Sequence, residues 1–190
     1  MDFEALKSNV TADWQALSNW RDEAEKEYAF KDGHQWTEAE KAALEENSRV
    51  PVVFNRVQVI IASVSGSEIN NRTEVRFIPR EIGDAKPNEI LTAGAEWFRD
   101  EANAEDEETQ AFEDLLVAGI GWTETLLDYM ADTEGAPRVV RLDSLEMCWD
   151  KHAHRKGLQD ATRVARVRSI PLSEAMDMFP GKESSEINAD

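Results

Sequence analysis

Apolar residues near the N-terminus recur every three or four positions, which is the period of one face of an α-helix. Asp32 and Gly33 then supply a turn signal that ends the pattern. The spacing predicts one long N-terminal helix, and its apolar face carries Phe3, Leu6, Val10, Trp14, Leu17, Trp20, Ala24 and Tyr28.

Two further helices are predicted before residue 71. Thr37 and Glu40 have the spacing of a capping box, in which the hydroxyl accepts from a first-turn amide and the carboxylate reaches back to the cap amide. A short, exposed helix should therefore run to about Glu46. Beyond Pro51 a second stripe at helical spacing, ending near Asn70, consists of Val53, Val57, Ile60, Ile61 and Val64. This helix is the most apolar of the chain, so we expect it to be the most buried.

The remaining chain mixes helical and strand periods. Gly119 and Gly121 lack Cβ atoms, so they permit an abrupt change from a helix to a strand. We expect a helix carrying Ile90, Leu91, Trp97 and Phe98, further helices over 104–118 and 171–179, and strands over 73–78, 122–129, 138–142 and 162–169. The predicted fold class is α+β, with a long N-terminal helix and amphipathic helices packed on a small mixed or antiparallel sheet. One domain should span 1–180, followed by a polar, mobile tail at 181–190.

Charge sets limits on the partners. The 190 residues include 39 acidic and 21 basic side chains, a formal net charge of −18. Because proteins that bind phosphates need an excess of Lys and Arg, this balance disfavours nucleic-acid binding and favours protein partners. The longest apolar stretch, 57–64, is too short to cross a membrane, and the N-terminus has no signal-peptide pattern.

No set of residues indicates catalysis or a cofactor. Cys148, Asp150, His152 and His154 lie close together but lack the second ligand pair of a structural zinc site, so we expect no metal. The carboxylates of 105–108 are neighbours on one helix and therefore point around its circumference, which predicts a solvated acidic face.

Two arginines suggest where an acidic surface could find a partner. Arg166 and Arg168 share one face of a predicted strand, and the region 96–114 is rich in acids that include Glu105 and Glu108. We predict an ion-pair surface formed by these four residues, either within one chain or between subunits. The tryptophans lack a basic groove, so core or interface packing is favoured over base stacking, and Trp14, Trp20 and Trp97 have helical core spacing.

Several short sequence segments, in the same order along the chain, resemble segments of one protein family. They are Ala12-Asp13-Trp14, PVVFNRV at 51–57, NRTEVRFIPRE at 71–81, and the stretch GIGWTETLL…LDSLEMCWD at 119–150. Together they resemble the wing region of portal proteins from short-tailed double-stranded DNA phages and prophages.

The resemblance implies a structural, non-enzymatic role. It also implies that Trp149 packs and that Asp150 caps a turn in the corner that ends the last of these segments. In that family, usually twelve subunits form a ring at one capsid vertex, assembled in the host cytoplasm and kept in the virion. The ring meets scaffold, capsid, terminase and tail adaptor proteins, and DNA passes through it as cargo during genome packaging and ejection. Family subunits continue into stem, clip and crown segments, which have no counterpart in this sequence.

One alternative belongs to a different class of function. A small acidic protein can bind a DNA-binding protein by imitating the charge of DNA. Such a module would need a regular, exposed array of carboxylates.

Overall fold

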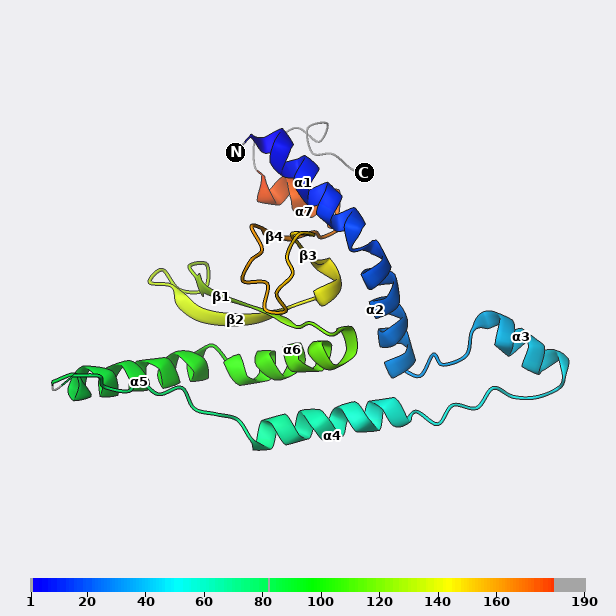
Figure 1. Ribbon diagram of the computed structural model, residues 1–190, viewed down its shortest axis with the longest axis horizontal. Helices are drawn as coiled ribbons and strands as arrows, with labels where there is room; N and C mark the ends of the chain where they lie inside the picture. The colour runs from blue at the N-terminus through cyan, green and yellow to red at the C-terminus, as the bar shows by residue number, and fades with distance from the viewer. Residues whose placement is uncertain (1, 82, 180–190) are drawn as a thin grey trace. The chain divides into compact units, whose positions relative to one another are not determined.

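The computed structural model describes residues 2–81 and 83–179, and the predicted tail at 181–190 lies outside them. The chain forms two compact units: Met1–Ala16 with Glu146–Asp190 (unit 1), and Leu17–Leu145 (unit 2). Along the described residues the helices come first, followed by two small antiparallel sheets of two strands each and then a last helix (Figure 1). The predicted α+β class is therefore confirmed.

Unit 1 pairs two short strands beside a helix. Strand β3 (Met147–Trp149) pairs antiparallel with β4 (Val164–Arg166), and α1 (Phe3–Ala16) packs against β3. Helix α7 (Leu172–Met178) follows with Pro171 at its N-cap. The sequence predicted a longer strand in place of β4 and gave no separate strand for β3.

The prediction of one long N-terminal helix is wrong. The chain instead forms α1 and α2 (Ser18–Lys31), interrupted at Leu17, where φ is −93° and ψ is 4°. That ψ lies outside the α-helical well, so the regular hydrogen-bond ladder breaks at this residue. Because the apolar spacing passes through Leu17 without a change of phase, the sequence pattern alone does not reveal the break.

The helices of unit 2 follow the predicted pattern closely. They are α2, α3 (Glu38–Glu46), α4 (Arg56–Asn70), α5 (Ala85–Glu101) and α6 (Ala104–Ala118). The capping box before α3 is confirmed, since the Glu40 amide donates to Thr37 Oγ1 at 3.3 Å and the Thr37 amide to Glu40 Oε2 at 2.8 Å. Helix α6 is the central element and contacts α2, α4, α5 and the following hairpin.

A β-hairpin follows α6. Gly119 caps the helix with a left-handed φ of 80°, and β1 (Trp122–Asp128) then pairs with β2 (Ala136–Leu142), placing Trp122 opposite Leu142. The core beneath the hairpin consists of small side chains, with Ala102, Ala104 and Val139 buried and Phe98 packed against them. The close approach of backbones, rather than large apolar side chains, therefore holds this part of unit 2 together.

The predicted strand over 73–78 does not form. Residues 72–80 have no regular secondary structure, although the Phe77 amide donates to Thr92 Oγ1 of α5 at 3.1 Å. A strand requires a second strand for its ladder of hydrogen bonds, and alternation in sequence does not supply one.

The expected burial of α4 is also wrong. Within this helix only Ser65 is buried, whereas Val59 and Ile60 are 68% and 62% exposed. Helix α4 contacts α2 and α6 along one side and leaves the rest of its apolar circumference uncovered.

Candidate functional site

The carboxylates of α6 are occupied by partners from other elements of unit 2. The pairs are Glu105 with Arg72, Glu108 with Arg99 at 2.6 and 2.7 Å, Glu113 with Lys31 at 3.7 Å, and Asp114 with Arg141 at 2.5 and 2.8 Å. Glu107 also accepts the Arg141 backbone amide at 2.6 Å. Glu105 and Asp106 are exposed, which agrees with the predicted solvated acidic face, whereas Glu107 and Glu108 are half-buried and paired. The spacing of acidic residues along one helix shows on which side of the helix each lies. It does not show which basic residues, distant in sequence, form ion pairs with them.

Asp114 is the most enclosed of these acids. Its side chain is 5% exposed and accepts from the Arg141 guanidinium and from the Tyr28 hydroxyl at 2.8 Å. Burial and the Asp114 hydrogen bond raise the pKa of Tyr28, and the same carboxylate raises the pKa of Arg141. The three side chains join α2, α6 and β2, so this cluster fixes the helix against the hairpin.

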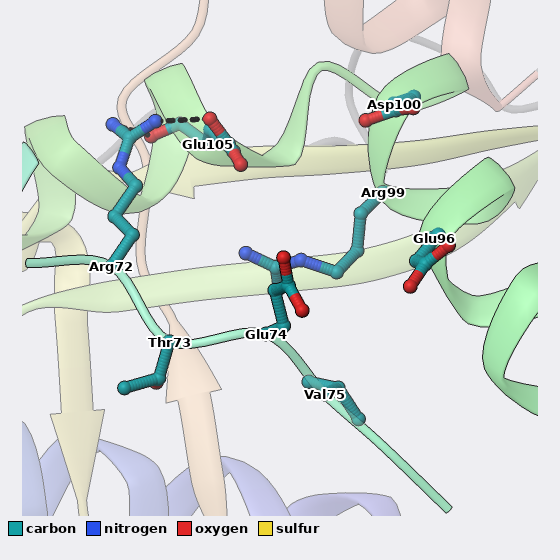
Figure 2. A pocket seen from close by; sticks show the side chains of 8 residues that line it. All are labelled: Arg72, Thr73, Glu74, Val75, Glu96, Arg99, Asp100 and Glu105. Carbon is teal, nitrogen blue, oxygen red and sulfur yellow. Dashed lines mark hydrogen bonds and ion pairs between the residues drawn. The ribbon is translucent and has the colours of Figure 1, made fainter.

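A pocket of about 260 Å³ opens beside the start of α6. Figure 2 shows its lining, where Arg72 on the chain after α4 reaches Glu105. The lining residues are Arg72, Thr73, Glu74, Val75, Glu96, Arg99, Asp100 and Glu105. Arg72, Arg99 and Glu105 of this lining belong to the ion-pair network, in which Glu108 of α6 holds Arg99 of α5. Such a lining contains no activated nucleophile and few of the apolar contacts typical of a small-molecule site.

The structure does not bring the four predicted ion-pair residues together within either unit. In unit 1, Arg166 pairs with Glu146 at 2.6 Å and Arg168 with Glu174 at 2.9 Å. Glu105 and Glu108 pair with arginines of unit 2, as described above. Pairing between subunits stays a prediction.

The corner after β3 is built on two buried aspartates of unit 1. Asp150 accepts from the His152 amide at 3.0 Å and from the hydroxyl of Thr162 at 2.5 Å, which confirms its predicted turn-capping role. These donors, led by the Thr162 hydroxyl, lower the pKa of Asp150 to about 2. Asp13, the middle residue of the Ala12-Asp13-Trp14 phrase, accepts from the Arg163 guanidinium at 2.5 and 3.0 Å.

This corner gives no metal centre in the part of the chain that the structure describes. Cys148 is 1% exposed, whereas His152 and His154 are exposed, and residues 2–81 and 83–179 contain no group of three potential ligands.

The tryptophans differ in their surroundings. Trp20 Nε1 donates to the Ala118 carbonyl at 3.2 Å, which ties α2 to the end of α6. Trp36 Nε1 donates to the Val52 carbonyl at 3.2 Å. Trp97 does not occupy the core position that its spacing suggested, since it is 59% exposed on α5.

The exposed apolar residues of unit 2 include two groups on and beside its helices. The first, here called the α4 surface, consists of Val50, Val52, Phe54, Val59, Ile60 and Val64. The second, the α5 surface, consists of Ile90, Gly94 and Trp97, one turn apart along that helix. In Figure 1 the segment leading into α4 and the helix α5 lie toward opposite ends of unit 2.

The comparison with known proteins decides the family. Residues 7–190 match the model of the phage P22-like portal protein family. The chain belongs to that family. It is also similar to the portal protein of Helicobacter pylori bacteriophage KHP30, with 21% identity over 179 residues, or 94% of this chain and 30% of the relative. The chain thus spans less than a third of the length of that portal protein.

For a portal family member, the residues that sequence reasoning missed are the exposed apolar ones. The uncharged run from Val57 to Ser67 was a visible signal, but its apolar stripe was attributed to burial within the chain. No helix of the described residues is long and apolar enough to cross a membrane.

Proposed function

We propose that this chain forms the wing-like region of a portal subunit. In this role it contributes to the ring at one capsid vertex through which the phage genome is packaged and later ejected. The observation that carries the proposal is the family match over residues 7–190. The similarity to the portal protein of bacteriophage KHP30 supports it independently along 94% of the chain.

The structure supports a mechanical rather than a chemical role. The carboxylates of α6 are held in ion pairs, and Asp114 joins three elements through Arg141 and Tyr28. Such a network keeps the helices and the hairpin in fixed positions, as a ring of constant shape requires. The net charge of −18 makes DNA a passing cargo for this region rather than a bound ligand.

The partners follow from the same proposal. Other copies of the subunit would form the ring, and the complete portal would meet scaffold, capsid, terminase and tail adaptor proteins. Assembly would occur in the host cytoplasm, and the product would remain in the virion.

Imitation of DNA by the acidic face is less well supported. A DNA mimic presents free carboxylates at regular spacing to a basic partner. Here Glu105, Glu108 and Asp114 are already engaged by arginines of unit 2.

Electron microscopy of the purified chain tests the proposal. Negative-stain images should show closed rings, and native mass spectrometry should give one dominant subunit number. Strictly monomeric particles under all conditions would count against a role for this region in ring contacts.

A second hypothesis concerns charge between subunits. Arg166 and Arg168 would pair with acids of a neighbouring subunit such as Glu105 and Glu108, in exchange for their partners within unit 1. Charge reversal at both arginines should then weaken assembly. Unchanged assembly and stability of the double variant would remove this hypothesis.

A further inference from the structure

The uncovered side of α4 is unusual for a chain of this charge. No ionisable residue occurs between Arg56 and Glu68, although charged residues make up 32% of the sequence. A helix that is largely apolar around its circumference is normally buried on most sides. Here α2 and α6 cover one side only, so the other side lacks a partner within unit 2.

The segment before α4 extends this apolar area. Val50, Val52 and Phe54 alternate with half-buried residues and are 80%, 57% and 81% exposed. The segment is anchored from behind, because Asn55 Nδ2 donates to the Lys31 carbonyl at 2.5 Å and Trp36 donates to the Val52 carbonyl. Its three apolar side chains are therefore held in a fixed position while pointing outward.

The size of the α4 surface fits a protein interface. From the exposed fractions, its six side chains present roughly 650 Å² to solvent, close to the ~800 Å² that each partner contributes to a standard interface. Phe54 is its largest exposed side chain, and aromatic anchors of this kind often dominate binding energy.

The α5 surface has complementary features. Ile90 and Trp97 are 67% and 59% exposed on either side of Gly94, where an added Cβ would meet no atom within 4 Å. A glycine between two large side chains leaves a recess that suits an aromatic side chain from a partner.

The charges beside the two surfaces are also complementary. Arg49 and Arg56 are exposed at the two ends of the segment 50–54, and they form no ion pair among the residues described. The ionisable neighbours of the α5 surface are mainly acidic, namely Lys86, Glu89, Glu96, Asp100 and Glu101. Two copies of a chain with net charge −18 repel each other, so contact is favoured where one side is basic or neutral.

We propose that the α4 surface of one copy packs against the α5 surface of a second copy, head to tail. This inference rests on the proposed ring function and names the contact within it. A rotationally symmetric ring needs two different, non-overlapping surfaces on each subunit, and unit 2 provides them.

The contact is tested by mixing two variants, each of which has lost one of the two surfaces. Phe54→Glu disables the α4 surface and Trp97→Glu disables the α5 surface, while each variant keeps the other surface intact. Sedimentation velocity over a wide concentration range should show association of the unmodified chain and monomers for each variant alone. An equimolar mixture of the two should form a heterodimer, because one intact contact remains between them.

The controls separate this contact from charge and folding effects. Met130→Glu adds the same charge at a position that is 97% exposed on the hairpin turn, and it should associate like the unmodified chain. Val59→Glu provides a second variant of the α4 surface, and it too should be complemented by Trp97→Glu. Each blocked variant should weaken self-association by about thirtyfold or more, as expected for a central anchor. Far-UV circular dichroism confirms that every variant is folded.

The outcomes distinguish this inference from the proposed function. Association of Phe54→Glu and Trp97→Glu at the unmodified strength would overturn the contact but leave the ring proposal intact. Monomeric variants whose mixture stays monomeric would also overturn the head-to-tail arrangement. An unmodified chain that never associates would also overturn the contact, and would mean that another part of the portal covers these surfaces, while the family match would still support the ring proposal.

Discussion

The junction between α6 and β1 provides the sharpest test of the packing. A Cβ atom at Gly121 would lie 1.9 Å from the Ala111 carbonyl oxygen and 2.8 Å from its carbonyl carbon. Both are backbone atoms in the middle of α6, so no side chain can rotate away to make room. Gly121→Ala therefore requires the strand to move from the helix by more than ~1 Å in a close-packed region.

The expected loss of stability is large. Overpacking of a well-packed site costs about 1–3 kcal/mol, and a clash with backbone belongs at the upper end or beyond. Against a total stability of roughly 5–15 kcal/mol, a loss of about 3 kcal/mol is substantial. The thermal midpoint of unit 2 should fall by roughly 10 °C.

Two other glycines serve as matched controls. Gly119→Ala meets no atom within 4 Å but must adopt a φ of +80°, so it should cost about 1–2 kcal/mol. Gly66→Ala lies inside α4 with open space around it and should stabilise the helix by up to about 1 kcal/mol. Urea unfolding at low protein concentration, followed by tryptophan fluorescence and by hydrogen exchange of α6 and β1, gives the ranking. If Gly121→Ala proves no worse than Gly119→Ala, close contact between β1 and α6 is not what requires this glycine.

Three further changes test other parts of the structure. Asp114→Ala should lower the free energy of unfolding of unit 2 by about 2–3 kcal/mol, measured by urea unfolding, because Arg141 loses its buried partner. The loss is limited because the Arg141 side chain stays about one third exposed to solvent. An effect smaller than that of a surface substitution would show that Asp114 does not hold α2, α6 and β2 together. Since the pKa of Asp150 is about 2 in the folded state and ~3.9 when unfolded, its contribution is complete above pH ~4 and is lost as pH falls toward 2. In Asp150→Asn the thermal midpoint of unit 1 should therefore fall less steeply as the pH is lowered from about 4 to 2. An unchanged dependence on pH in this range would refute the prediction. Thr37→Ala should weaken α3 by about 1 kcal/mol, seen as faster amide exchange confined to that helix, whereas uniform protection would show that the bond to Glu40 is dispensable.

Local chemistry made several elements predictable. The capping box at Thr37 acts on amides within three residues, so its spacing in sequence contains the whole interaction. The turn-capping bond from the His152 amide to Asp150 is equally local, whereas the bond from Thr162 to the same carboxylate spans twelve residues. The bounds of α6 follow in the same way, from acids in the first turn and Gly119 at the end. Interactions of this range were the ones that sequence analysis placed correctly.

Features that depend on distant partners were not predictable. Strand β3 exists because 164–166 pair with it, and 73–78 remain irregular although they alternate well. The arginines that pair with Glu105 and Asp114 are 33 and 27 residues away in the sequence. The apolar spacing in α4 indicated correctly that the helix has an apolar side suited to packing. It contained no information on whether the packing partner belongs to the same chain.

Salt separates the two contacts considered between subunits. Ion pairs within a unit leave its net charge unchanged, so copies with a net charge of −18 approach each other against repulsion that extends over a Debye length of ~8–10 Å. If apolar contact of Phe54 with the α5 surface dominates, added salt screens the repulsion and association should strengthen. If Arg166 and Arg168 hold the subunits through exposed ion pairs, salt screens the attraction and association should weaken instead. Sedimentation of the unmodified chain across a salt series thus reports, by the sign of its slope, which physical interaction closes the contact.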